Sequence, residues 1–381
     1  MEKNNLTYSD ILNIISNFNI EEEIDSAVPF GSGHINDTYK VCTLDKATPD
    51  FLLQKINHNI FKDVPGLINN IMHVTNHIKD KLGQIGCDNV FQSVLTLIQC
   101  KDGEYYYCDQ DGCYWRLYLF LAGTKSYDLV TTPKQAFEGG KAFGSFQTML
   151  SDMDANKLVI TIPNFHHLPF RLKQLKTARE ADLCMRVLCV AAELEFINQR
   201  VDKMHQIDRL AQLGFLPLRV THNDTKFNNV LLNEQDEAQC VIDLDTVMPG
   251  YAAFDFGDAV RTIISTAPED EPDLEKIQLN IDLFRAFTEG FMQQTIHHMH
   301  TTEIYSLVDG VLLLPFLMGV RFLTDYLNGD TYYKTQFSDH NLQRARAQFK
   351  LVEKLEESHS TLYGIIMDSV IIKNFNGSKV L

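Results

Sequence analysis

The sequence has no cysteine pair with the spacing of a zinc site. It contains eight cysteines, and the nearest couples, Cys108 with Cys113 and Cys184 with Cys189, are each separated by four residues rather than two. A chain of 381 residues, 45% of them hydrophobic, can bury a large core without disulfides. We therefore predict neither structural zinc nor a disulfide framework, and reduced thiols in a cytoplasmic protein.

Long hydrophobic runs are also missing. The longest candidate, residues 308–320, is interrupted by Asp309, Gly310 and Pro315, which argues against a membrane span. The first residues, MEKNNLTYSDILNI, lack the charged and then apolar pattern of a secretory signal. We therefore expect no membrane partner.

Basic residues are scarce relative to acidic ones. Lysine and arginine total 34 against 50 aspartate and glutamate residues, which gives a formal net charge of −16. Such a field repels nucleic acids, so we exclude them as partners.

Residues 220–245, VTHNDTKFNNVLLNEQDEAQCVIDLD, carry the most informative pattern that is present. It reads H-x-D-x-x-x-x-N from His222 through Asp224 to Asn229, followed by an apolar run that ends at Ile-Asp. Phosphoryl transfer needs a carboxylate that orients the attacking hydroxyl and oxygen ligands for Mg²⁺. We predict Asp224 as the base and Asn229 and Asp243 as the metal ligands, while His222 orients the loop.

The same segment predicts a hairpin. The apolar runs 229–232 and 240–242 are typical of two short strands, with a turn at 234–238, which would bring both metal ligands to one edge. Asp245 is either a further ligand or a support for Asp243. The alternative is an ordinary surface hairpin with Asp and Asn at its turns. The supporting motifs elsewhere in the chain favour the catalytic interpretation.

A glycine loop and a strand lysine supply those motifs. In FGSGHINDTYKV, Gly31, Ser32 and Gly33 would let backbone N–H groups approach phosphate oxygens. Lys55 lies in the strand-like run FLLQKI and is the candidate for contacting the α and β phosphates. The alternative for Lys55 is an edge-strand lysine that prevents aggregation.

The helix expected after this strand lacks its usual partner for the lysine. Kinase-like folds pair the strand lysine with a helix glutamate, but residues 63–82 have helical spacing and contain no glutamate. Either Asp63, Asn69 or Asn70 orients Lys55, or the pair is absent.

We predict two lobes with a connector. Residues 1–117 form the nucleotide-binding lobe, in which VFQSVLTLIQC and EYYYCDQDGCYWRLYLF are expected as antiparallel strands with turns near Gly103 and Gly112. Residues 118–124 form the hinge, and residues 125–381 form a lobe dominated by helical periodicity. In kinase-like folds such a connector offers backbone groups to adenine, so the expected candidates here are four residues: Tyr118, Leu119, Phe120 and Leu121.

These motifs resemble the aminoglycoside-phosphotransferase and choline-kinase superfamily, and most closely the N-acetylhexosamine 1-kinases. The resemblance extends from about residue 28 to 335 and includes YWRLYLFLAGTKSYD, CVIDLDTVMPGYAAFDFGDAVR and GVRFLTDYLNGDTYYK. It implies an α+β, protein-kinase-like two-lobe fold. It also implies that ATP and Mg²⁺ are used to phosphorylate the anomeric hydroxyl of N-acetylglucosamine or N-acetylgalactosamine.

Substrate selection is expected from the larger lobe. Arg321 and Asp325 would share a helix face, with Tyr326 beside them, so that a guanidinium and a carboxylate could address a sugar. The alternative is an ion pair worth about 0.3–0.5 kcal/mol on a solvated face. Weaker candidates are His34 and Asn36 in the glycine loop. Asp255, Asp258 and Arg261 are weaker candidates too, although residues in such a pattern more often anchor a lobe internally.

Two other functions stay open. One is a kinase of the same fold that acts on homoserine, choline or an aminoglycoside, since the tyrosines at 326, 332 and 333 would also suit a cationic substrate. The other is a hydrolase or a binding module without activity. No cysteine begins the C-x-P-x-R signature of a sulfatase, and the intact candidate residues disfavour an inactive module. The oligomeric state, monomer or dimer, is not predicted.

Overall fold

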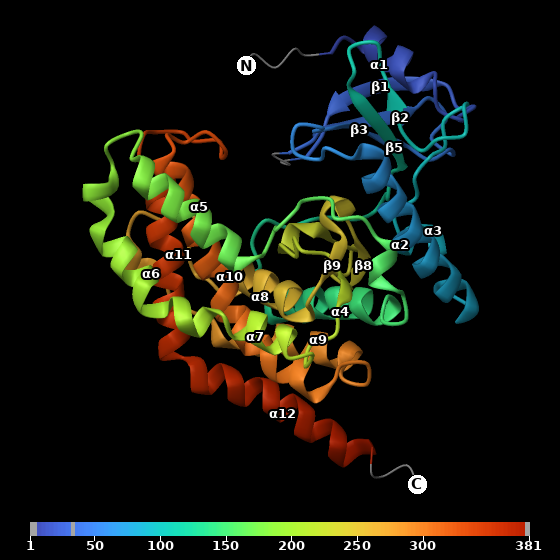
Figure 1. The fold of residues 1–381 in the computed structure, drawn as a ribbon. Helices are drawn as coiled ribbons and strands as arrows, with labels where there is room; N and C mark the ends of the chain where they lie inside the picture. Colours follow the sequence, from blue (N-terminus) through green and yellow to red (C-terminus); the bar gives the residue numbers. More distant parts are fainter. Residues whose placement is uncertain (1–5, 32–34, 378–381) are drawn as a thin grey trace.

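The computed structural model describes residues 6–31 and 35–377, with side chains to residue 370. It has a small lobe built on an antiparallel sheet and a larger lobe of helices (Figure 1). This confirms the predicted α+β two-lobe architecture. All eight cysteines are free.

The small lobe contains a five-stranded sheet in the order β1-β2-β3-β5-β4. One face packs on helix α1, where Ile11 and Phe18 meet Val41, Leu53 and Trp115. The other face turns toward helix α2 and the large lobe. The elements of this lobe are α1 (Tyr8–Ile15), β1 (Ile24–Pro29), β2 (Asp37–Thr43), β3 (Phe51–Ile56), α2 (Val64–Gln84), α3 (Val90–Ser93), β4 (Tyr107–Cys108) and β5 (Tyr114–Leu119).

Strand β3 divides its side chains between these two faces. Residues two apart on a strand share a face, so Phe51, Leu53 and Lys55 face α1. Leu52, Gln54 and Ile56 face the large lobe. The burial pattern agrees, because Leu53 belongs to the α1 cluster and Ile56 to the cluster between the lobes. Lys55 therefore projects from the far side of the sheet.

The prediction for the segment after α2 is wrong at its start. Residues 90–93 form the short helix α3, in which Ser93 Oγ donates to the carbonyl oxygen of Asn89 at 3.1 Å. The chain then runs extended along β5, with a bridge between Leu97 and Tyr118. The predicted turns are present, since Gly103 and Gly112 have φ of 97° and 74°, values that favour glycine.

The large lobe is helical apart from two short hairpin-like pairs. The predicted hairpin is confirmed by the antiparallel pairing of β7 with β8, and β6 pairs with β9. The elements of the large lobe are α4 (Pro133–Met149), α5 (Leu168–Ala181), α6 (Ala191–Met204), α7 (Gln206–Gln212), β6 (Arg219–Thr221), β7 (Val230–Leu232), β8 (Ala238–Val241), β9 (Met248–Gly250), α8 (Ala252–Ile263), α9 (Ile281–Thr295), α10 (Thr301–Leu327), α11 (His340–Glu357) and α12 (His359–Gly377).

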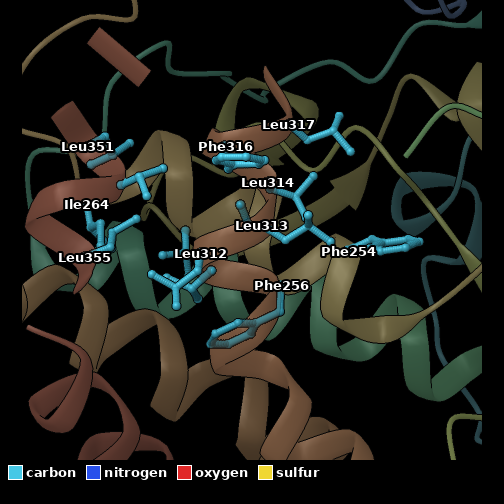
Figure 2. Packing of buried hydrophobic residues seen from close by; sticks show 14 of the residues in the cluster. Phe254, Phe256, Ile264, Leu312, Leu313, Leu314, Phe316, Leu317, Leu351 and Leu355 are labelled. Atoms are coloured by element: carbon cyan, nitrogen blue, oxygen red, sulfur yellow. The ribbon is translucent and has the colours of Figure 1, made fainter. Parts of the chain in front are cut away.

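Helix α10 is the centre of this lobe. It is long and apolar enough to cross a bilayer, but 89% of its most apolar window is buried inside the protein. An apolar helix buried on all sides is typical of the core of a large domain. Figure 2 shows side chains of this core: Phe254, Phe256, Ile264, Leu312, Leu313, Leu314, Phe316, Leu317, Leu351 and Leu355.

Glycines allow two helix pairs to approach closely. A Cβ atom on Gly290 of α9 would overlap with the carbonyl oxygen of Phe137 in α4, and one on Gly140 would overlap with that of Phe287. Gly257 of α8 and Gly310 of α10 meet in the same way. The absence of side chains at these positions sets the spacing of the helices beneath the hairpins.

We predict that Gly290→Ala lowers the free energy of unfolding by about 2–3 kcal/mol, because the added methyl group forces α9 away from α4. The matched control is Gly83→Ala on α2, where no atom lies within 4 Å of the new Cβ. Relief of backbone entropy should make that variant neutral or about 0.5–1 kcal/mol more stable. Urea unfolding of both variants checks this, and equal effects would contradict the packing account.

Candidate active site

Asp255 of α8 anchors the loop that carries Asp224. Its carboxylate accepts the backbone N–H of His222 at 2.9 Å and that of Asn223 at 2.7 Å, and Gln147 Nε2 at 2.5 Å. Burial raises the pKa of Asp255, while these donors and His222 oppose the increase. Asn223 has φ of 63°, a left-handed conformation that needs such support.

His222 connects this loop to the segment after β8. Its ring lies against Phe143 and Phe146, and Nε2 is 2.9 Å from the carbonyl oxygen of Ile242. A carbonyl only accepts, so Nε2 carries the proton and Nδ1 accepts the N–H of Asp224 at 3.3 Å. These contacts orient the loop, and they leave His222 no free nitrogen for proton transfer.

The Asp224 carboxylate lies beside a lysine that the sequence analysis did not single out. Lys226 Nζ is 3.1 Å from Asp224 Oδ2, and Asn229 Nδ2 donates to the main-chain oxygen of Asp224 at 2.8 Å. Asp224, followed by Asp243 and Asp258, raises the pKa of Lys226 despite burial. The D-x-K spacing of Asp224 and Lys226 is the feature of the sequence that could have indicated this lysine. Lys226 therefore places a positive charge against one oxygen of the Asp224 carboxylate.

Asp243 and Asn229 supply the oxygen atoms that suit a magnesium ion. Asp243 has φ of 61°, and burial followed by the carboxylates of Asp245 and Asp224 raises the pKa of Asp243. A cation among these acids would relieve that crowding. Because Nδ2 of Asn229 is engaged, its Oδ1 is turned the other way. This set fits Mg²⁺, which usually takes one or two protein carboxylates and completes its shell with phosphates and water.

The described residues contain no group of three or more His, Cys, Asp or Glu side chains able to hold a metal alone. Asn229 and Asp243 would therefore need further ligands, such as water or phosphate oxygens, to complete the coordination shell of Mg²⁺.

Asp245 is engaged by other residues. Arg116 of β5 binds it through both terminal nitrogens, with Nη1 on Oδ1 and Nη2 on Oδ2 at 3.0 Å, and Asn36 Nδ2 donates to Oδ2 at 2.7 Å. Arg116 and Asp245 are almost fully buried, at 1% and 2% exposure. The prediction of Asp245 as a direct metal ligand is not supported. The predicted substrate contact of Asn36 is not supported either, since this side chain also accepts the N–H of Asn57 at 3.0 Å.

Lys55 does not face the other candidate residues. Its ammonium group lies over the Trp115 ring at 5.6 Å, on the α1 face of the sheet. Burial opposes protonation there, but Cys113, Asp109 and Asp37 outweigh it and raise the pKa of Lys55. The positions that face the large lobe are occupied by Gln54 and Arg116, whose Nε donates to Gln54 Oε1 at 3.0 Å.

Helix α2 does not orient Lys55 with any of the three candidates. Asp63 caps the helix by accepting the N–H of Gly66 at 2.9 Å. The side chain of Asn70 donates to Val159 O and accepts the N–H of Val159, and it also donates to Val247 O at 3.0 Å. Asn69 accepts His73 Nδ1 through its carbonyl oxygen. In the described residues no acid of helix α2 forms an ion pair with Lys55.

The structure describes only some of the candidate nucleotide-binding residues in the glycine loop and the connector. Gly31 has φ of 78°, while Ser32, Gly33 and His34 lie outside the described residues. In the connector, the N–H of Leu119 donates to Thr96 O at 2.9 Å and that of Phe120 to Asp50 O at 2.9 Å. Among the described hinge residues, the N–H groups of residues 121–124 donate no hydrogen bond.

Tyr118 is buried in β5 beside Arg116. The guanidinium carbon of Arg116 lies 5.2 Å from the centre of the Tyr118 ring. Phe120 contacts Phe30 edge to face at 5.6 Å and carries Lys40 over its ring at 4.2 Å. Two aromatic rings therefore lie beside the connector, and the Lys40 ammonium group over one of them is paired with Asp50 at 3.1 Å.

The structure separates the three substrate candidates on α10. Arg321 lies 5.1 Å from the centre of the Phe165 ring and 5.7 Å from that of Tyr333. Asp325 instead accepts the backbone N–H groups of residues 331–333 at 2.8–2.9 Å and Asn341 Nδ2 at 2.9 Å. In the described part of the chain Arg321 and Asp325 make no ion pair. Asp325 shapes the loop that places Tyr333, and its predicted substrate contact is not supported.

Tyr326 contacts other residues than Arg321 does. Its hydroxyl group donates to Asp339 at 3.3 Å, and the guanidinium of Arg186 covers its ring at 4.3 Å. Its predicted substrate contact is not supported.

In the described part of the chain, three buried polar atoms of this region have no hydrogen-bond partner: His166 Nδ1, Asp258 Oδ2 and the Tyr333 hydroxyl. Burial lowers the pKa of His166 to about 4, so its ring is neutral at pH 7. Its Nε2 is 2.9 Å from the carbonyl oxygen of Asn223 and therefore carries the proton, which leaves Nδ1 as a bare acceptor. Asp258 uses its other oxygen for Arg261 at 2.9 Å, the internal anchor expected for this pair.

Comparison of the chain with known proteins finds a family match and several similar folds. A model of the phosphotransferase enzyme family matches residues 26–289, more than half of the chain. The fold is similar to that of three solved structures, each under 25% identical in sequence.

A microcompartment-associated aminopropanol kinase has a TM-score of 0.61 at 14% identity and covers 93% of this chain and 98% of its own. An aminoglycoside phosphotransferase from Alicyclobacillus acidocaldarius has 0.62 at 11%, covering 96% and 98%. A choline kinase from Cryptosporidium parvum has 0.55 at 16%, covering 94% and 97%.

We predict that Arg116→Met lowers the free energy of unfolding by about 3–5 kcal/mol, because Asp245 would keep a buried charge without its partner. Lys55→Met, one strand away and on the other face, should cost less than about 1 kcal/mol. Chemical denaturation measures both. A larger loss for Lys55→Met than for Arg116→Met would contradict the assignment of the two faces.

Proposed function

Because the chain belongs to the phosphotransferase enzyme family and has the fold of small-molecule kinases, we propose that it phosphorylates the C1 hydroxyl of an N-acetylhexosamine, using ATP and Mg²⁺. The observation that carries this proposal is the convergence of Asp224, Lys226, Asn229 and Asp243. The sugar class comes from the sequence resemblance to the N-acetylhexosamine 1-kinases.

Asp224 is the base. Lys226 holds Oδ2, so Oδ1 can accept the proton of the attacking hydroxyl. The sugar oxygen forms a bond to the γ-phosphorus as the bond to the leaving ADP oxygen breaks, and the proton passes to Asp224. Lys226 lies where it can also balance charge on the transferred phosphoryl group.

Asn229 Oδ1 and Asp243 hold the metal in this proposal. When bound, Mg²⁺ neutralises charge on the phosphate oxygens. Residues 118–124 form the adenine-binding connector, with the free N–H of Leu121 as its donor. Gly31, Ser32 and Gly33 contribute the phosphate loop.

The acceptor side offers a mixture of donors and acceptors. His166 Nδ1 and Asp258 Oδ2 are acceptors without a partner, and Arg321 supplies donors. Such a mixture suits the hydroxyl groups of a sugar, because each buried atom without a partner costs about 1–3 kcal/mol until a ligand satisfies it. We place the substrate between Asp224 and Arg321.

The second candidate is a kinase of the same fold that acts on homoserine, choline or an aminoglycoside. The rings of Phe165 and Tyr333 would favour a cationic acceptor. Arg321 already lies over both rings, and Lys226 adds another positive charge nearby. This charge disfavours choline and aminoglycosides relative to a sugar.

The direct test is product identification by phosphorus NMR. The protein is incubated with ATP, Mg²⁺ and one acceptor at a time from N-acetylglucosamine, N-acetylgalactosamine, homoserine, choline and an aminoglycoside. We expect a sugar 1-phosphate, recognised by coupling of phosphorus to the anomeric proton, only with the hexosamines. Phosphorylation of an amine-bearing acceptor alone would overturn the sugar assignment.

We predict that Asp224→Asn lowers kcat by about 10²–10⁴-fold, because the amide cannot accept the proton. Nucleotide binding and folding should change little. The control is Asp236→Asn in the β7–β8 turn, which has φ of 56° and hydrogen-bonds Tyr127 at 2.7 Å, features that asparagine preserves. Steady-state kinetics compare the two, and wild-type turnover in Asp224→Asn would remove this residue from the mechanism.

A further inference from the structure

Two guanidinium groups meet at Phe165. Arg171 of α5 donates Nε and Nη2 to the carbonyl oxygen of Phe165 at 3.3 and 3.0 Å. Arg321 of α10 lies over the ring of the same residue. Both arginines are partly buried, and the two helices lie next to one another in the large lobe (Figure 1).

Neither of these arginines faces a carboxylate in the described part of the chain. The remaining contacts of Arg171 are with Gln174 Oε1 at 2.9 Å and the Phe170 ring, and Arg321 contacts Met318 Sδ at 3.4 Å. Other buried arginines differ in this respect. Arg116 is bound to Asp245 and Arg261 to Asp258 and Glu269.

The charge on this pair is costly without a counterion. Burial, and after it the repulsion from Arg321, lowers the pKa of Arg171 to about 10. Like charges in a partly desolvated place repel much more strongly than in water. An anion held between them would remove that repulsion and would gain charge-assisted hydrogen bonds.

The pair lies next to the reaction centre. His166, only 7% exposed, contacts the Phe165 ring at 4.5 Å and binds the carbonyl oxygen of Asn223, the residue before Asp224. Its Nδ1 is the acceptor without a partner, and His166 also interacts electrostatically with Arg171, Arg321 and Asp258. A ligand that reaches His166 from Asp224 therefore extends to the two guanidinium groups.

We propose that Arg171 and Arg321 form an anion subsite for the acceptor, and that the preferred substrate is an N-acetylhexosamine with a sulfate or carboxylate substituent away from C1. The inference rests on the proposed function for the site of phosphorylation. Two planar guanidinium groups match the oxygens of either anion. His166 Nδ1 then accepts a ring hydroxyl.

The test compares three acceptors at constant ionic strength: N-acetylglucosamine, its 6-sulfate, and N-acetylmuramic acid, which carries a carboxylate. At least one anionic sugar should have a kcat/KM about tenfold or more above that of the neutral sugar. The two anionic acceptors distinguish sulfate from carboxylate. Calorimetric titration of the wild-type protein with each sugar, without ATP, measures binding independently of turnover.

Arg171→Gln should lower the anionic-to-neutral ratio of kcat/KM by about 10- to 100-fold, the size of a charge-assisted contact. Arg321→Lys, which keeps the charge but loses the fork, should reduce the ratio less. Arg179→Gln is the control, because it lies on the same helix and is exposed. Circular dichroism checks that each variant is folded.

The possible outcomes separate the two proposals. Turnover of neutral and anionic sugars with equal kcat/KM, and equal calorimetric affinity, overturns the anion subsite and leaves the sugar kinase intact. Binding of an anionic sugar that is lost in Arg171→Gln, without turnover of any hexosamine, supports the subsite and overturns the proposed reaction. Absence of both binding and turnover overturns both.

Discussion

The buried ion pair between Arg116 and Asp245 connects the two lobes, and the geometry of the site depends on it. Removing two charges from water costs several kcal/mol for each ion. Bidentate contact and the hydrogen bonds from Asn36 to Asp245 and from Arg116 to Gln54 offset this cost. Since Asp245 is two residues from Asp243, the pair fixes the proposed metal ligand relative to the sheet that would hold the nucleotide.

The large lobe positions the other half of the site through Asp255. This carboxylate holds two successive backbone N–H groups before Asp224, while His222 connects the same loop to Ile242 beside Asp243. Asn223 and Asp243 both have left-handed backbone conformations, which non-glycine residues adopt only where their surroundings support them. Glycine contacts between α4 and α9 and between α8 and α10 provide the rigid base beneath these loops.

The residues that could be predicted from the sequence lie within one short segment. Asp224, Asn229 and Asp243 are brought together by a loop and a hairpin that are local in the chain, so their spacing was sufficient. Lys55 could not be placed in this way, because both faces of its sheet are covered and the run FLLQKI does not tell which face meets the large lobe. Arg116, His166 and Arg171 carry no local motif and reach the site only through tertiary packing. Asp325 has the helical spacing expected of a substrate residue, but it is used to hold the loop after α10.

A crystal structure with a non-hydrolysable ATP analogue, Mg²⁺ and an N-acetylhexosamine tests the central claim most directly, that four side chains of one segment converge on the transferred phosphate. We expect the metal on Asn229 and Asp243, the γ-phosphate near Lys226, and the sugar C1 hydroxyl within hydrogen-bonding distance of Asp224. A nucleotide bound on the α1 face of the sheet beside Lys55, or a metal held away from Asp243, would contradict the account.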